Sequence, residues 1–174
     1  MSTSTLGDNI KKKMVVYSMG YVEDLRKIVG NQTLILVRPS VAIVNSFGKI
    51  LLVKYQDQSW GIPGGLMELG ESVEECLRRE VKEEINLELK SLRLFGVFSG
   101  SELFTKLRNG HEYYNIIIGY ICTEFNGEIK PDGEEVIEAN YFNLFDLPEG
   151  TQPYIKEKLK ELGPKLEQMF RGNQ

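Results

Sequence analysis

The 174-residue sequence has few of the residues that build common nucleophilic or zinc-dependent active sites. His111 is its one histidine, and no evident Ser–His–Asp or Cys–His set includes it. Neither paired histidines nor a Cys-x-x-Cys motif is present, which disfavours a zinc site. Because Cys76 and Cys122 are the only cysteines, we expect both to be reduced core residues rather than a disulfide or a metal pair.

Long apolar runs and excess positive charge are also missing. No stretch of about 18 apolar residues occurs, so we expect no membrane span. The N-terminus lacks the apolar core of a signal peptide, and we place the protein in the cytoplasm. A net charge of −4 and a pI of about 5.2 argue against bulk binding to nucleic acid or anionic membrane, although a local basic pocket for phosphates stays open.

What is present fits one folded domain. The chain is long enough for a sizeable core, and its 41% hydrophobic and 26% charged residues are ordinary for a globular protein. Residues 1–18 are polar and include a lysine run at 11–13, so we predict a flexible extension there. A single domain is expected over residues 19–174, because the sequence shows no repeat, linker or low-complexity tract.

Strand and helix patterns indicate an α+β fold. Helices are expected at 21–29 and 151–162, the second interrupted by Pro164, and a further charged helix near the middle of the chain. Pro39 is expected to separate the first two strands. The predicted strands are 33–37, 41–44, 50–55, 87–98, 103–107, 113–123 and 141–142. Because strands occur before and after the charged helix, a mixed arrangement of sheet and helices follows.

The stretch from Pro63 to Leu87 organises the rest of the chain. Its helix is predicted to start after Ser72, an N-cap that Glu75 completes as a capping box. Asn86 is expected to end the helix, because asparagine tolerates the left-handed conformation of a C-terminal cap.

Acidic residues of this helix lie where apolar residues are expected. At about 100° per residue, Glu80 and Glu84 fall within the apolar stripe, and Glu83 falls on its flank. Partly buried charges are unfavourable unless they are paired or bound to metal. A hard dication is the simplest compensation, because it prefers oxygen ligands. The alternative is a solvated, salt-bridged helix face, which explains neither the placement of the acids nor the Gly64-Gly65 turn before the helix.

Fixed spacings connect this turn to the helix. Gly65 is followed after five residues by Glu71, and after seven more by the run REVKEEINL at 79–87. This pattern resembles the signature of the Nudix hydrolases, with Asn86 as the one departure, where the family has glycine. The resemblance covers roughly residues 39–148. It implies an α/β/α sandwich with a mixed β-sheet, against which the signature forms a loop and a helix.

The resemblance also implies roles for individual residues. The implied ligands for Mg²⁺, or alternatively Mn²⁺, are the backbone carbonyl of Gly64 and the carboxylates of Glu80, Glu83 and Glu84. Glu71 is implied to pair with Arg79 and to orient the glutamates. The catalytic base is implied to be Glu80 or an acid of a later loop, for which Glu135 is the candidate and Glu134 the second choice; a solvated acidic loop is the alternative.

The implied reaction is Mg²⁺-dependent hydrolysis of a diphosphate linkage in a nucleoside diphosphate derivative. A divalent ion neutralises phosphate charge and lowers the pKa of a bound water, so no covalent nucleophile is required. The competing hypothesis is a catalytically silent nucleotide-binding or regulatory module on the same fold. Such family members usually lose acids of the signature, whereas all of them are present here.

The substrate is less well defined than the reaction. The marks of the ADP-sugar, dinucleoside polyphosphate, NADH and coenzyme A subfamilies are absent, and a nucleoside triphosphate is the preferred example. Four aromatic residues are candidates to stack on a base: Trp60, Phe98, Tyr113 and Tyr114. For Trp60 a core position is the alternative. The expected partner is a small nucleotide, not nucleic acid or membrane, and a homodimer is left open.

Overall fold

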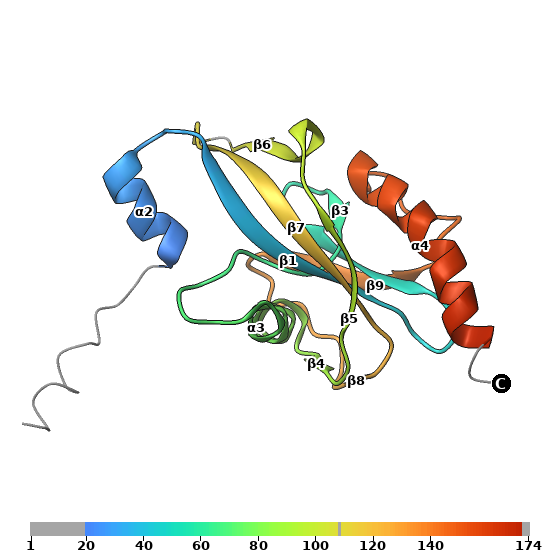
Figure 1. The fold of residues 1–174 in the computed structure, drawn as a ribbon. Helices are drawn as coiled ribbons and strands as arrows, with labels where there is room; N and C mark the ends of the chain where they lie inside the picture. Colours follow the sequence, from blue (N-terminus) through green and yellow to red (C-terminus); the bar gives the residue numbers. More distant parts are fainter. Residues whose placement is uncertain (1–19, 108, 172–174) are drawn as a thin grey trace, which may run out of the picture.

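The computed structural model describes residues 20–107 and 109–171 (Figure 1). The predicted extension, residues 1–18, lies outside the described residues, so the division into an extension and one domain stays a prediction. The elements in chain order are α2 (Tyr21–Val29), β1 (Leu34–Ile43), β2 (Ile50–Tyr55), β3 (Trp60–Gly61), α3 (Val73–Ile85), β4 (Glu88–Leu89), β5 (Arg93–Phe98), η1 (Ser101–Leu103), β6 (Phe104–Lys106), β7 (Glu112–Cys122), β8 (Phe125–Asn126), β9 (Val136–Phe142) and α4 (Pro153–Arg171).

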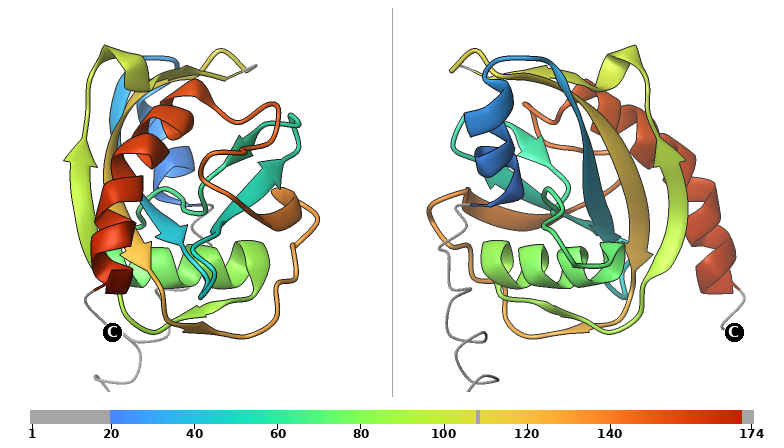
Figure 2. Two further views of the ribbon diagram at one scale, coloured as in Figure 1. Left: turned by 90° about the vertical axis from the view of Figure 1, so that its right-hand side faces the viewer. Right: turned by 60° about the vertical axis from the view of Figure 1, so that its left-hand side comes forward.

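The strands form one mixed sheet and two smaller antiparallel ones. In the mixed sheet the order is β1-β7-β5, with β6 also paired to β7. Strands β1 and β7 are parallel, whereas β5 and β6 run antiparallel to β7. A second sheet has the order β3-β2-β9, and β4 pairs with β8. The mixed sheet is confirmed, and β6 and β7, which follow one another in the chain, form an antiparallel pair (Figure 2).

Alternating residues of the central strands pack into two separate cores, because successive side chains of a strand point to opposite faces. One core joins Val41 and Ile43 of β1 to Leu77, Val81 and Ile85 of α3. The other joins Ala42 of β1, and Val44 just after it, to Leu159, Leu162 and Leu166 of α4. Helices α3 and α4 therefore cover opposite faces of the strands, as Figures 1 and 2 show. The predicted α/β/α sandwich is confirmed.

Strand β1 continues through Pro39, where the sequence predicted a break. On the edge away from β7, the Val41 N–H donates to the carbonyl of Pro63 (3.0 Å) and the Met67 N–H donates to the carbonyl of Val37 (3.3 Å). Residue 39 faces the same edge as residues 37 and 41, since strand residues alternate in direction. A proline there removes no hydrogen bond from the β1–β7 ladder, which explains why the strand tolerates it.

Three further boundaries differ from expectation. The single strand predicted at 87–98 is divided into β4 and β5, which belong to different ladders. Strand β9 starts at Val136, earlier than predicted, because it pairs along the length of β2. Helix α4 runs through Pro164, and Leu162 and Leu166 on either side of it pack into the same core, at 1% and 3% exposure.

The cysteines, the first helix and the expected lack of a membrane span can also be compared with the described residues. Cys76 and Cys122 are free and buried, as predicted. Helix α2 is tied to the start of β7, where the Arg26 guanidinium donates to the carbonyl of Glu112 at 2.8 Å. Within the described part of the chain, no helix has both the length and the apolar character needed to cross a membrane.

Candidate active site

Helix α3 has the caps that its sequence indicates. The Ser72 hydroxyl accepts from the Glu75 N–H at 3.2 Å, and the Glu75 carboxylate accepts from the Ser72 N–H at 2.7 Å, which forms the predicted capping box. Asn86 has the left-handed conformation expected of the C-terminal cap, with φ 61° and ψ 23°. These caps fix where the helix begins and ends, and so which turn presents each acid.

The two glycines before the helix are required by close contacts. A Cβ atom on Gly64, whose φ is +142°, would lie 2.2 Å from the Pro39 carbonyl oxygen. A Cβ atom on Gly65 would lie 2.1–2.3 Å from the carboxyl atoms of Glu80. Gly64 therefore allows the loop to lie against β1, and Gly65 leaves room for the Glu80 side chain under the loop.

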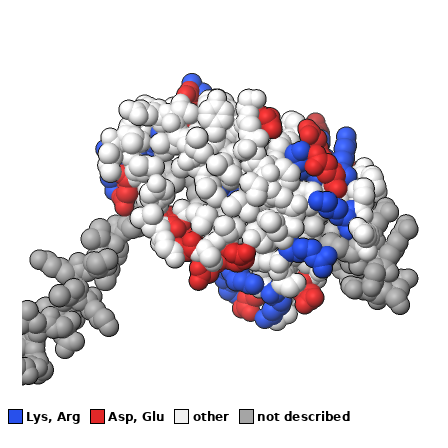
Figure 3. Space-filling view, in the orientation of Figure 1, with Lys and Arg blue, Asp and Glu red and all other residues white. Residues whose placement is uncertain are grey.

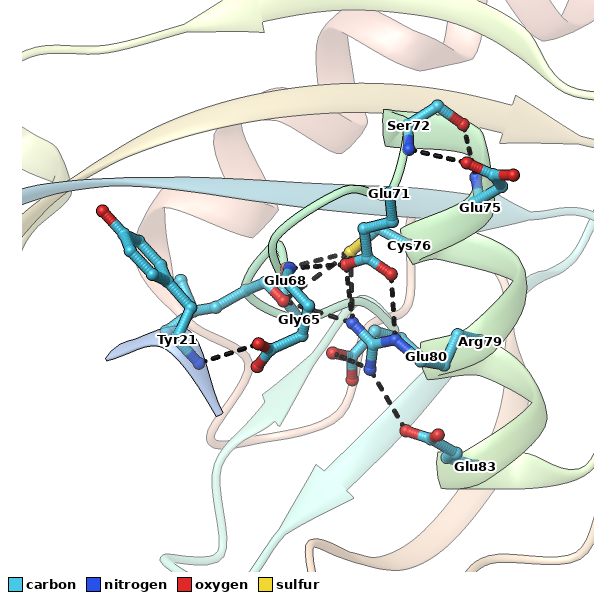
Figure 4. Close-up of polar contacts among 11 residues, drawn as sticks. Tyr21, Gly65, Glu68, Glu71, Ser72, Glu75, Cys76, Arg79, Glu80 and Glu83 are labelled. Atoms are coloured by element: carbon cyan, nitrogen blue, oxygen red, sulfur yellow. Dashed lines mark hydrogen bonds and ion pairs between the residues drawn. The ribbon is translucent and has the colours of Figure 1, made fainter. Parts of the chain in front are cut away.

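One arginine holds three of the acids (Figure 4). Arg79 donates to both carboxylate oxygens of Glu71, from Nε at 3.0 Å and from Nη2 at 2.9 Å. Its Nη1 donates to Glu80 at 2.8 Å and to Glu83 at 3.2 Å. The hydrogen bonds from Arg79 lower the pKa of Glu71 to about 2. The pairing of Glu71 with Arg79 that the resemblance implied is therefore present.

Glu84 is the most deeply buried of the acids, at 3% exposure. Its carboxylate accepts a hydrogen bond from the Gly64 N–H at 3.2 Å. Burial raises the pKa of Glu84 to about 8, and burial also raises the pKa of Glu80. Both carboxyl groups thus lie where water is largely excluded and where a bound cation would be most stabilising.

Arg38 of β1 is a site residue that the sequence reasoning missed. Its Nη2 donates to the Gly64 carbonyl at 2.6 Å, which is the carbonyl expected to bind metal. Its charge opposes the rise in the pKa of Glu84, for which burial is the main cause. Arg38 is the only charged residue in the sequence of β1, and that isolation within an apolar strand was the signal that could have found it.

The acids do not converge on one point as they are placed. Across residues 20–107 and 109–171, no group of three or more His, Cys, Asp or Glu side chains is arranged to hold a metal ion. Glu80 and Glu83 turn to Arg79, and Glu84 turns to the Gly64 N–H. The chemistry of the donors nonetheless fits a hard divalent ion, since all are oxygens and two belong to buried or partly buried carboxyl groups.

The acidic loop before β9 lies beside the C-terminal end of α3. The Asp132 N–H donates to the Glu84 carbonyl oxygen at 3.0 Å, and the Asp132 carboxylate accepts from the Glu135 N–H at 3.2 Å. The Glu135 side chain is exposed, and its charge adds to the effect of burial on the pKa of Glu84. Glu134, the second choice, is also exposed. The role of Glu135 as a base stays a prediction.

A cleft of about 740 Å³ opens on the α4 side of the mixed sheet. Arg38 lines it, so the cleft adjoins the Gly64 carbonyl and the acids behind that carbonyl. Tyr113 of β7 also lines it, as predicted for a residue that contacts substrate. Tyr114, the next residue, does not line the cleft, because successive side chains of a strand point to opposite faces; its ring lies 5.2 Å from that of Phe104. Of these two tyrosines, which were both predicted to contact a base, only Tyr113 lies at the cleft.

The other two aromatic candidates lie apart from this cleft. Trp60 is 7% exposed and packs edge-on against Phe142 with ring centroids 5.0 Å apart, so the core position left open for it is the one observed. Phe98 lines a smaller apolar pocket between β5 and α4, where its ring contacts Phe95 and Tyr154. Of the four predicted substrate contacts, only Tyr113 lines the cleft.

Comparisons with known proteins agree with this geometry. The NUDIX domain profile matches residues 36–163, and the chain therefore belongs to the Nudix family. An ADP-ribose pyrophosphatase of Methanocaldococcus jannaschii is 37% identical over 119 residues, which cover 64% of this chain and 66% of that protein. The NAD-capped RNA hydrolase NudC of Vibrio atlanticus is 29% identical over 112 residues, covering 63% of this chain and 38% of that protein. The chain thus spans only part of the length of these relatives.

Solved structures with the same fold support the assignment. A MutT Nudix hydrolase from Burkholderia pseudomallei is 27% identical, with a TM-score of 0.61 over 72% of this chain and 96% of that chain. A MutT protein from Methanosarcina mazei, at 19% identity, has a TM-score of 0.62 over 77% of this chain and 96% of that chain, and this likeness concerns the fold alone.

Proposed function

We propose that this protein hydrolyses a diphosphate linkage in a nucleoside diphosphate derivative, using water and a divalent metal ion. The observation that carries the proposal is the folded signature: the acids of α3 lie beside the Gly64–Gly65 turn, and Arg38, which contacts that turn, lines a cleft large enough for a small ligand. Family membership supports the same class of reaction.

The metal site belongs to the proposal. Mg²⁺, or Mn²⁺, would be held by the carboxylates of Glu80, Glu83 and Glu84 and by the Gly64 carbonyl. When bound, such an ion neutralises charge on the diphosphate and lowers the pKa of a water. In the structure, Arg79 pairs with Glu80 and Glu83, and Arg38 donates to the Gly64 carbonyl, so the two arginines would keep these groups in place before the ion arrives.

The proposal also assigns one residue to orient the acids and two candidates to accept a proton. Glu71 holds Arg79 through two hydrogen bonds and thereby positions the guanidinium between Glu80 and Glu83. Glu80 is the first candidate to accept the proton of the attacking water, because burial raises its pKa toward the working range of a base. Glu135, on the loop beside α3, is the second candidate.

The comparisons change the preferred substrate. The names of the relatives specify ADP-ribose and NAD-capped RNA, and both molecules contain a diphosphate between two ribosyl groups. We therefore favour a nucleoside diphosphate joined to a second group over the triphosphate that the sequence suggested. A cytoplasmic location, the absence of nucleic-acid and membrane partners, and a possible homodimer remain predictions.

A substitution on an exposed acid tests the proposal. Glu83→Gln removes one proposed ligand whose side chain is 62% exposed, so the fold should be unaffected. With Mg²⁺ and a panel of ADP-ribose, NAD and ATP, we expect turnover to fall on the order of 10²-fold or more. Glu88→Gln is the matched control, since it makes the same charge change at an exposed acid paired with Lys82, and it should keep wild-type rates.

The outcomes separate the two functional hypotheses. Wild-type rates in Glu83→Gln would refute the site assignment. A wild-type protein that binds a nucleotide but hydrolyses none of the panel would support the silent binding module. Hydrolysis by the wild type that requires both Mg²⁺ and Glu83 would support the enzyme.

A further inference from the structure

Buried polar atoms without partners gather around the cleft. Among the described residues, four buried side-chain atoms have no hydrogen-bond partner, and three belong to residues that line the cleft: Asn115 Oδ1, Tyr154 Oη and Ser59 Oγ. These residues come from β7, α4 and the loop before β3, so they approach the cleft from different sides. An unsatisfied buried polar group costs about 1–3 kcal/mol, and native proteins contain few of them. Because three of these four residues line one cleft, a ligand in that cleft is the candidate source of the missing partners.

Asn115 has the best-defined orientation of the three. It is 8% exposed, and its Nδ2 donates to the Leu103 carbonyl and to the Thr105 hydroxyl, both at 3.2 Å. A carbonyl oxygen can only accept, so the Leu103 contact determines which side-chain atom is nitrogen. The Oδ1 atom is therefore an acceptor without a donor among the described residues, and an O–H or N–H group of a ligand would satisfy it.

The sheet register places Asn115 close to the proposed reaction centre. Leu36 pairs with Asn115, and Arg38 pairs with Ile117, so Asn115 and Arg38 lie on the same face of the sheet in adjacent rows. Two residues along a strand span about 7 Å. Arg38 contacts the Gly64 carbonyl, so the diphosphate is expected beside Arg38. At that position, the group attached directly to the diphosphate, rather than a more distant base, would lie near Asn115.

The lining of the cleft favours an uncharged, donor-rich group. Arg38 is the only Lys or Arg among the described lining residues, whereas Glu102 and Glu157 contribute carboxylates that accept hydrogen bonds. A further phosphate in this cleft would face acidic groups, but a sugar would offer hydroxyl donors. The chemistry therefore fits a sugar attached to the diphosphate.

We propose that Asn115 determines specificity by accepting a hydrogen bond from a hydroxyl of the sugar attached to the substrate diphosphate. The hydroxyls of Tyr154 and Ser59 are further contacts for the same part of the ligand. This inference rests on the proposed function, because it takes the diphosphate to lie beside Arg38 and the acids.

Calorimetric binding of two sugar phosphates, AMP and ribose 5-phosphate, tests the inference in the presence of Mg²⁺. Neither contains a diphosphate, so binding is measured without turnover. We expect AMP or ribose 5-phosphate to bind the wild type about 10-fold or more tightly than 2′,3′-dideoxy-AMP or propyl phosphate, respectively. In Asn115→Ala that advantage should fall below about twofold, because the acceptor is gone.

Matched variants separate recognition from folding. Thr105→Val removes one of the two groups that hold the Asn115 amide but leaves Oδ1 in place, so it should keep the hydroxyl preference. Tyr154→Phe removes a hydroxyl that has no partner in the described part of the chain, and it should weaken binding of the sugar phosphate about 3- to 10-fold without loss of thermal stability. A loss of preference in Thr105→Val equal to that in Asn115→Ala would overturn the assignment.

The ligand arms distinguish the remaining possibilities. A preference seen with AMP assigns the nucleoside sugar to Asn115, and one seen with ribose 5-phosphate assigns the second sugar; either supports the proposal. Equal binding of ligands with and without hydroxyls, or an unchanged preference in Asn115→Ala, overturns it. Diphosphate hydrolysis without hydroxyl preference refutes the role of Asn115 alone. Hydroxyl-dependent binding without any hydrolysis refutes the proposed function and leaves Asn115 as a sugar contact.

Discussion

The α3 side and the α4 side of the central strands differ in how their polar groups are paired. On the α3 side, Arg79 holds Glu71, Glu80 and Glu83, and Glu84 accepts from the Gly64 N–H. The residues of this region come from one continuous stretch of chain. Each of these side chains has a hydrogen-bond partner within the protein, so the region keeps its arrangement without a ligand.

The cleft on the α4 side is built in the opposite way. Its walls come from β1, β7, the loop before β3 and α4, and three of its buried polar atoms have no partner among the described residues. Figure 3 shows that the charged residues of one face lie mainly along its border and near α4, while its middle is largely uncharged. The comparison suggests that the first region serves the chemistry common to the family and the second selects what is attached to the diphosphate.

The largest effect should follow from closing the contact between the loop and α3. Gly65→Ala would place a Cβ atom 2.1 Å from the Glu80 carboxyl carbon, so Glu80 or the loop must move. A misplacement of about 1 Å can lower a rate by roughly 10²-fold, and we expect a loss of that order. Turnover measurements check this, with Gly163→Ala as the control, because nothing lies within 4 Å of that position. Full activity in Gly65→Ala would show that the Glu80 position is unimportant.

Weakening the ion-pair network should affect stability and function together. Arg79→Lys cannot reproduce the two-pronged contact with Glu71, so we expect unfolding free energy to fall by about 1–3 kcal/mol and activity by roughly 10- to 100-fold. Combining it with Glu71→Gln in a double-mutant cycle should give a coupling energy of about 0.5–3 kcal/mol. Additive losses would mean that the two side chains act independently.

Burial of Glu84 should make the unfolding free energy depend on pH. The pKa of Glu84 is raised to about 8 in the folded protein, so the folded state binds more protons than the unfolded state between about pH 4.5 and 8. Its contribution to stability is full at low pH and is lost as pH rises through that window. The side chain of Glu84→Gln stays neutral at all pH values. The unfolding free energy of this variant should therefore rise relative to that of wild type by about 2–4 kcal/mol between about pH 5 and pH 9. Urea unfolding with a chelator measures this, and parallel pH profiles would contradict it.

The smallest effect should come from removing one tyrosine hydroxyl on the α3 side and one on the α4 side of the central strands. Tyr120→Phe removes a hydroxyl that donates to Glu74 at 2.6 Å, and we expect a loss of about 0.5–1.5 kcal/mol in unfolding free energy. Tyr154→Phe removes a buried hydroxyl that has no partner among the described residues, so stability should stay the same or rise by up to about 1 kcal/mol. Thermal or urea unfolding compares the two, and equal losses would remove the distinction between the regions.

The elements that local chemistry specifies were predicted well. The capping box of Ser72 and Glu75 and the left-handed Asn86 set both ends of α3, because each contact spans only a few residues. Pro39 and Pro164 misled the prediction for the opposite reason. Whether a proline ends an element depends on which edge or core it meets, and neighbours distant in the sequence supply that context.

The site was predicted only in part. The pair of Glu71 and Arg79 follows from spacing along the helix and its loop. The burial of Trp60 in a core, the separation of Tyr113 from Tyr114 and the contact of Arg38 with Gly64 do not follow from spacing. They depend on strand register, since a shift of one residue exchanges the faces of a strand.

By itself, the sequence determined the family, the acidic helix with its caps, and the glycine turn that precedes it, because these depend on contacts within a few turns of chain. Only the tertiary structure decided that Arg38, Ser59, Asn115 and Tyr154 border a single cleft. Those residues are far apart along the chain and carry no shared pattern, and only the packing of β1 on β7 beneath α4 brings them together.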